Sequence, residues 1–189
     1  KRDAQHEVSR RSLIKWSLAA GAALGVSRSD IFGILERTAG KATAFAAAEK
    51  ALTPGIRDDI RFARDRVQDF ARRQRDSMHE FSAELIPGLM AGQKLIACNT
   101  AGCYVPGGRY AHAASAIMSV GTAQVAGVKN IIATSPAAKD HGVHPGILYA
   151  MKLCGAHTVL ALGGVQAIAA LAYGSFSGHE ADIIVGPGN

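Results

Sequence analysis

The sequence lacks the patterns that define several common classes of protein. Its three cysteines, Cys98, Cys103 and Cys154, have no CxxC spacing, which argues against a zinc ribbon or a disulfide framework and favours reduced, partly buried thiols. No GxGxxG lies at an expected strand–helix junction, and GxxxxGK[ST] and HExxH do not occur. The apolar run Trp16–Val26 is shorter than the roughly 20 residues of a membrane-spanning helix, so we expect no stable membrane span.

Charge is distributed unevenly along the 189 residues. Residues 1–76 hold 16 Lys and Arg against 10 Asp and Glu, whereas residues 77–189 hold five of each kind. The apolar half therefore has no basic surface for nucleic acid, and in the front half the basic residues alternate with acids. We expect no nucleic-acid partner.

The front end combines a basic stretch with a mild apolar run, which is the layout of an export signal. Arg10 and Arg11, followed by Leu13, Ile14 and Lys15, resemble a twin-arginine signal, which sends folded proteins across a membrane. A cytosolic amphipathic helix with a basic start is the alternative. The localisation is thus open between the cytoplasm and the periplasm.

After the front segment the pattern becomes helical and then alternates between strands and helices. Thr53-Pro54 is typical of a helix start, and Ile56, Ile60, Ala63, Val67 and Phe70 form one apolar stripe. We expect a signal-like segment over 1–48, a helical arm over 49–92 and a Rossmann-like region over 93–189 that is truncated at its C-terminal end.

Residues 93–189 repeat a unit of a small-residue helix, a closing glycine, a continuously apolar strand and a small-residue loop. Gly127 and Gly155 close two such helices. Continuously apolar strands are typical of a parallel sheet covered by helices on both faces. The pattern predicts an α/β fold with a Rossmann-like open parallel sheet, preceded by a helical N-terminal segment.

Small or turn residues follow four of the expected strands. They are Pro106-Gly107-Gly108, Thr134-Ser135-Pro136, Gly163-Gly164 and Gly186-Pro187-Gly188-Asn189. In an open parallel sheet these ends share one edge, where ligands bind and where bare backbone amides can approach a phosphate. Together the four loops predict a nucleotide crevice.

The chain resembles the histidinol dehydrogenase family in several motifs with matching order and spacing from about Leu52 to Asn189. They are "GCYVPGG", "SAIMSVGTAQVAGVKNIIATSP", "ILYAMKLCGA", "LGGVQAIAALAYGS" and "IIVGPGN". The form "PGGRYAHAASAIMSV" with "GVHPGILYAM" is closer to the sulfopropanediol dehydrogenase branch. The resemblance implies an NAD- and zinc-dependent oxidoreductase that converts an alcohol through an aldehyde to a carboxylate. L-histidinol or a sulfonated diol is the implied substrate, and a homodimer is implied for the full-length protein.

The family's NAD-contacting positions fall on Tyr104, Gln166 and Asn189 of this chain. Tyr104 offers a ring and a hydroxyl at a strand end, and the Gln166 amide both donates and accepts hydrogen bonds. Asn189 stands on a glycine loop. A half-buried tyrosine, a helix-start glutamine and a turn asparagine are the alternative, structural roles.

The family's zinc ligands and catalytic Glu-His pair correspond to positions downstream of Asn189, so we expect neither metal ligands nor catalytic residues in this chain. Alone it should bind NAD poorly and be inactive. Arg109 and His112 could face an anionic substrate, or lie on a surface loop; His144 is expected to cap a helix, and His157 to be solvated. The alternative function is a degenerate nucleotide-binding or structural module without catalytic activity.

Overall fold

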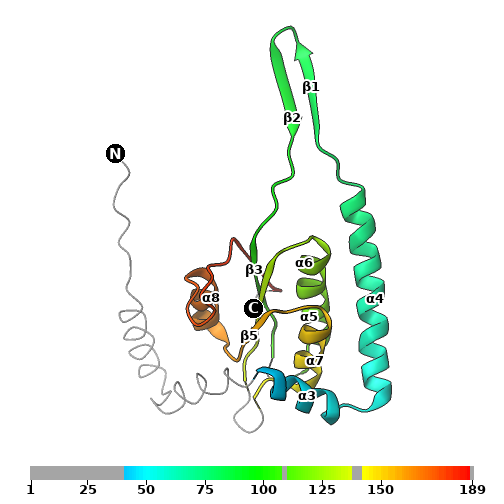
Figure 1. The fold of residues 1–189 in the computed structure, drawn as a ribbon, viewed down its shortest axis with the longest axis vertical. Coiled ribbons are helices and arrows are strands. Elements are labelled where there is room, and N and C mark those ends of the chain that lie inside the picture. The colour runs from blue at the N-terminus through cyan, green and yellow to red at the C-terminus, as the bar shows by residue number, and fades with distance from the viewer. Residues whose placement is uncertain (1–40, 108–109, 138–141, 188–189) are drawn as a thin grey trace. The chain divides into compact units, whose positions relative to one another are not determined.

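The computed structural model describes residues 41–107, 110–137 and 142–187, and residues 42–189 form one compact unit. This unit opens with helices α3 (Lys41–Ala51) and α4 (Pro54–Asp76), coloured blue to cyan-green in Figure 1. Thr53 is the N-cap of α4, and its Oγ1 accepts a hydrogen bond from the Ile56 amide at 3.4 Å. The predicted start of this helix is therefore confirmed.

Helix α4 packs through a face that only partly matches the predicted apolar stripe. Ile60 is buried as predicted, but Phe70 is 64% exposed. The other buried positions are Ala71 and Gln68, whose amide donates to Gln124 Oε1 at 2.7 Å. A polar contact in the helix interface thus sets which face of α4 is buried, and hydrophobic periodicity cannot detect it.

A β-hairpin occupies the end of the segment that was expected to be a helical arm. Strands β1 (Phe81–Ile86) and β2 (Leu89–Gln93) pair antiparallel, and every residue of both strands is exposed. The turn contains Gly88 at φ +83°, whose amide donates to the Glu84 carboxylate at 2.7 Å. The segment Lys94–Cys98, which leads from the hairpin to the central sheet, belongs to no strand.

The central sheet has four parallel strands in the order β5-β4-β3-β6, which confirms the predicted α/β fold. Their bounds are β3 Thr100–Tyr104, β4 Asn130–Thr134, β5 Thr158–Leu160 and β6 Ile183–Val185. Residues of β3 and β4 are almost wholly buried, as expected for strands covered on both faces. The two inner strands thus form the rigid base of any site at the sheet edge.

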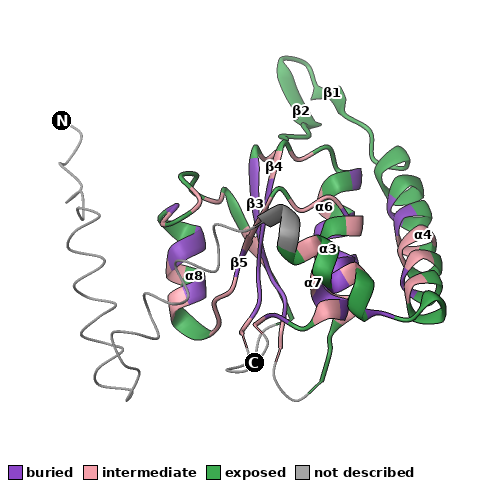
Figure 2. Ribbon diagram, turned by 60° about the horizontal axis from the view of Figure 1, so that its bottom comes forward, coloured by how far each residue is buried: buried purple, intermediate pink, exposed green. Residues whose placement is uncertain are grey.

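Helices cover both faces of this sheet (Figure 2). On one face lies a continuous helical stretch made of α5 (Ala113–Ala116), the π-helical turn η1 (Ile117–Gly121) and α6 (Thr122–Val125), together with α7 (Pro145–Leu153). Helix α8 (Gly164–Ala172) covers the other face. The two faces correspond to two hydrophobic clusters, a larger one centred on Ile131 and Ile147 and a smaller one on Ile132 and Leu171.

The start of α7 confirms the predicted role of His144. Its side chain is the N-cap, and Nδ1 accepts a hydrogen bond from the Gly146 amide at 3.1 Å. Pro145 occupies the first helical position, where its missing N–H costs nothing. Local chemistry therefore fixes where the chain turns from the loop into α7.

Candidate functional site

The carboxyl ends of all four parallel strands meet at one edge of the sheet, as predicted. Tyr104 of β3 is in register with Thr134 of β4, and Thr134 with Leu160 of β5. On the other side of β3, Cys103 pairs with Val185 of β6. The described parts of the four small-residue loops therefore begin next to one another.

The strand order places a topological switch point between β3 and β6. Strands β3, β4 and β5 lie side by side in chain order. The chain then crosses back through α8, and β6 pairs with the other side of β3. At such a point the two neighbouring loops diverge to opposite faces and leave a crevice in which open α/β sheets bind ligands. Tyr104 is the last residue of β3 and Gly186 directly follows β6, so both lie at this switch point.

Tyr104 is joined to the start of α8 by a hydrogen bond. Its side chain is 8% exposed, and the hydroxyl oxygen accepts from the Gly164 amide at 3.2 Å. Gly164 has φ +64°, and the Gln166 Oε1 lies 3.0 Å from the position that a Cβ on Gly164 would take. The structure thus brings Tyr104 and Gln166 to the same turn, whereas Asn189 lies outside the described residues.

The glycines of these loops allow neighbouring strand ends to touch. A Cβ on Gly186 would lie 2.8 Å from the Tyr104 carbonyl oxygen, and one on Gly163 would lie 2.6 Å from Pro136 Cγ. A Cβ on Gly107 would lie 3.0 Å from Ser135 Oγ. These contacts give the glycines a packing role, in addition to any approach of a ligand to bare backbone. The Gly164 amide already has a partner in Tyr104.

Sequence reasoning singled out neither of the two hydroxyl side chains at the end of β4. Thr134 is buried, and its Oγ1 donates to the Leu162 carbonyl at 2.7 Å, which ties the loop after β5 to β4. Ser135 is also fully buried, but its Oγ has no hydrogen-bond partner among the described residues. The motif "TSP" signals a turn, and nothing in its letters distinguishes these two hydroxyls.

The thiols near the sheet do not supply a nucleophile. Burial raises the pKa of the Cys103 thiol to about 11, against a smaller opposing effect of its hydrogen bond with Ser119. Burial likewise raises the pKa of Cys154 to about 11, against the positive charge of Arg64. Both therefore stay protonated at neutral pH, and Cys98 is half-buried and free. The burial of these thiols agrees with the prediction, and their reduced state stays a prediction.

The described histidines do not form a metal site. No group of three or more His, Cys, Asp or Glu within residues 41–107, 110–137 and 142–187 is placed to hold a metal ion. His157 is exposed as a residue, yet its Nδ1 accepts a hydrogen bond from the Ile131 amide at 3.0 Å, so it is not simply solvated. His112 is exposed and makes no side-chain cap bond at α5, and Arg109 lies outside the described residues.

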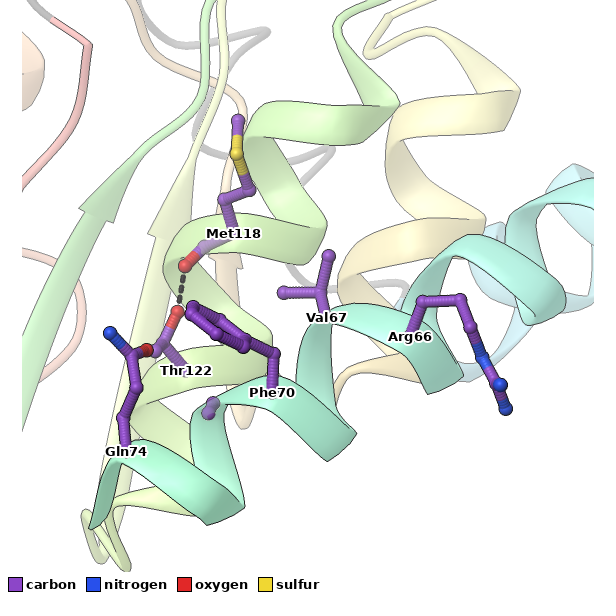
Figure 3. Close-up of a pocket in the computed structure, with 7 residues that line it drawn as sticks. Arg66, Val67, Phe70, Gln74, Met118 and Thr122 are labelled. Carbon is purple, nitrogen blue, oxygen red and sulfur yellow. Dashed lines mark hydrogen bonds between the residues drawn. The ribbon is translucent and has the colours of Figure 1, made fainter. Parts of the chain in front are cut away.

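A cavity of about 390 Å³ lies at the helical face, between α4 and the η1–α6 stretch (Figure 3). Phe70, Val67 and Met118 provide most of its apolar lining, and the Thr122 hydroxyl donates to the Met118 carbonyl (Figure 3). Arg66 is its one charged lining residue. None of the residues predicted from the sequence to contact a cofactor lines this cavity, so the sheet edge is the candidate site.

An open parallel sheet with helices on both faces and a switch point between β3 and β6 defines an α/β protein with a Rossmann-like fold. The sequence model of histidinol dehydrogenase matches residues 27–189, and the chain belongs to the histidinol dehydrogenase family. Over its whole length the chain superposes on histidinol dehydrogenase from Elizabethkingia anophelis with a TM-score of 0.69 and 23% identity. That likeness covers 45% of the solved chain and supports the fold.

The curated relatives are similar over about three quarters of this chain. A histidinol dehydrogenase homolog of Pelagibacter ubique is 58% identical over 75% of this chain and 33% of its own length. Sulfopropanediol 3-dehydrogenase of Ruegeria pomeroyi is 52% identical over 71% and 31%, and histidinol dehydrogenase of Methanothermobacter thermautotrophicus is 39% identical over 75% and 33%. The chain thus spans about a third of the length of these relatives.

A second sequence model matches the front of the chain. Residues 7–27 match the signal sequence of the twin-arginine translocation pathway. This match includes Arg10 and Arg11 and supports the resemblance that these residues suggest. Within the part of the chain that the structure describes, no helix combines the length and apolar character needed to cross a membrane.

Proposed function

We propose that residues 93–189 bind NAD at the crevice between β3 and β6, as the nucleotide-binding part of a dehydrogenase that oxidises an alcohol through an aldehyde to a carboxylate. The main support is the switch point itself, with Tyr104 at the end of β3 and Gly186 after β6. When bound, NAD supplies the acceptor for the hydride that leaves the substrate carbon. The membership in a dehydrogenase family supports the same class of reaction.

In this proposal the chain's own residues bind and orient the cofactor. Tyr104 Oη already accepts from Gly164, so its remaining O–H can donate to an acceptor in the crevice. Gln166 adds an amide next to the same turn, and Asn189 follows the β6 loop as a third contact. The hydrogen bond between Tyr104 and Gly164 holds the α8 turn in place before a ligand arrives, which lowers the entropic cost of binding.

Zinc does not fit the described residues, because they contain no ligand cluster. We therefore propose that any zinc site of the enzyme is built by other parts of the full-length protein, and we route no step through it. The identity of 52% to the sulfopropanediol enzyme, against 39% to the histidinol dehydrogenase of Methanothermobacter thermautotrophicus, favours a sulfonated diol over L-histidinol as substrate.

The proposal is tested by Tyr104→Phe in the full-length protein, which removes the hydroxyl and keeps the buried ring. Loss of one hydrogen bond should raise the KM for NAD roughly threefold to tenfold, with little change in KM for the alcohol. Initial rates of NADH formation with a sulfonated diol and with L-histidinol give both constants and identify the substrate.

Tyr149→Phe is the matched control, because Tyr149 is equally buried but lies on α7, under Arg61. It should leave the KM for NAD unchanged. Equal KM values for wild type and Tyr104→Phe would refute the role of Tyr104. A full-length protein that forms no NADH with either substrate and does not bind NAD would favour a degenerate module instead.

A further inference from the structure

The hydroxyl of Ser135 is fully buried at the functional edge and has no hydrogen-bond partner among the described residues. Buried polar groups are almost always paired, so an orphaned one calls for a partner outside the described residues. Its neighbour Thr134, at the same strand end, shows the usual outcome, since its hydroxyl donates to the Leu162 carbonyl. Of the two neighbouring hydroxyls, Thr134 and Ser135, only the Ser135 hydroxyl has no partner among the described residues.

Ser135 lies next to the loop that follows β3. A Cβ on Gly107 would lie 3.0 Å from Ser135 Oγ and 3.1 Å from the Pro136 carbonyl oxygen, so a side chain at Gly107 would press against Ser135 and Pro136. In Rossmann-type sheets the loop after the first strand approaches the pyrophosphate of a dinucleotide. Here β3 is the first strand of the parallel sheet, and 105–107 begins that loop.

Ser135 and Tyr104 lie on opposite faces of the sheet at the same edge. Tyr104 bonds to the first residue of α8, which covers one face. Thr134 bonds toward the loop that leads into α8, and because side chains alternate along a strand, Ser135 faces the helices α5–α7. A dinucleotide that crosses the edge can therefore contact both side chains through different parts of the molecule.

We propose that Ser135 is a cofactor-binding residue whose hydroxyl donates a hydrogen bond to the pyrophosphate of the dinucleotide. This inference rests on the proposed NAD-binding function. A serine hydroxyl is a donor that matches the acceptor oxygens of a phosphate, and it carries no charge to bury when the site is empty. The hydroxyl is fully buried beside Gly107, so the pyrophosphate reaches it when the 105–107 loop shifts.

The test compares Ser135→Ala with wild type in the full-length protein, by calorimetric titration with NAD and with ADP-ribose and by thermal unfolding without ligand. Both ligands contain the pyrophosphate, so both Kd values should rise about threefold to tenfold. The melting temperature of the ligand-free variant should stay equal or increase, because the substitution removes an unpaired buried polar group. A purely structural serine would instead lower it.

Ser119→Ala is the matched control. Its hydroxyl has an acceptor, the Ser115 carbonyl at 2.7 Å, so its loss should lower the melting temperature slightly and leave both Kd values unchanged. Unchanged Kd values for Ser135→Ala would overturn the inference and leave the NAD function intact. A rise for NAD alone would overturn the pyrophosphate contact. Wild-type protein that binds neither ligand would overturn the proposed function and this inference with it.

Discussion

Single glycines at the strand ends decide how closely the loops of the candidate site approach one another. A Cβ on Gly186 would clash with the backbone and Cβ of Tyr104, and one on Gly163 would clash with Pro136. Neither has the positive φ that would require glycine for backbone reasons. Glycine is therefore needed at these positions because it has no side chain. This lets β6 pack against β3 at the switch point, and it lets the loop after β5 pack against the end of β4.

Gly186→Ala tests this packing role. The added Cβ would meet the Tyr104 carbonyl oxygen at 2.8 Å and must push the end of β6 away from β3. We expect the free energy of unfolding to fall by about 1–3 kcal/mol and NAD binding to weaken. Chemical denaturation and titration with NAD measure the two effects.

Gly55→Ala provides the control, since a Cβ there meets nothing within 4 Å on helix α4. It should leave NAD binding unchanged and stabilise the protein by about 0.4–1 kcal/mol, if at all. A Gly186→Ala variant as stable as this control would show that the β6 end is free to move.

Residue type and position predicted part of the site, and tertiary packing determined the rest. Tyr104 at a strand end and Gln166 at a helix start could be chosen from motifs, and the structure places them at one turn. The sequence carries no sign that Ser135 is buried and unpaired, because that depends on where Gly107 and Pro136 lie. Whether these residues contact NAD stays a prediction.

At the scale of elements, the sequence predicted the strands and helices that have a strong hydrophobic pattern or a local capping signal. The strands β3 and β4 and the helices α7 and α8 lie where apolar runs, Pro145 and the closing glycines place them. The hairpin β1–β2 was missed because its strands bury nothing and alternate only weakly. Its Pro87-Gly88 turn was the available signal.

The π-helical turn η1 was also beyond sequence reasoning. It interrupts the stretch from α5 to α6, within the small-residue helix that Gly127 was expected to close. The extra residue in this turn shifts the helix face, and Ile117, Val120 and Gly121 are all buried there. Small-residue composition predicts a helix but does not reveal where its hydrogen-bond register changes.

At the scale of the whole molecule, the chain combines two segments that match different kinds of sequence. Residues 7–27 match a twin-arginine signal, and residues 27–189 match a dehydrogenase family that we propose uses NAD. A twin-arginine signal carries already folded proteins, so export and a bound cofactor are compatible. We propose that the signal is functional.

A reporter fused to residues 1–50 tests the signal directly. Cell fractionation should find the reporter outside the cytoplasm, and an Arg10→Lys, Arg11→Lys variant should retain it inside, because the arginine pair is the recognised feature. A fusion with the reporter in the cytoplasm before any substitution would show that the motif is accidental. The measurement does not depend on whether the enzyme is active.

The central claim, that the crevice between β3 and β6 binds NAD, is tested most directly by a crystal structure of the full-length protein grown with NAD. The account predicts the dinucleotide across the carboxyl ends of β3 and β6, with Tyr104 in contact and its pyrophosphate beside the 105–107 loop. A dinucleotide bound elsewhere, such as the cavity between α4 and the η1–α6 stretch, with the β3–β6 edge empty, would contradict it.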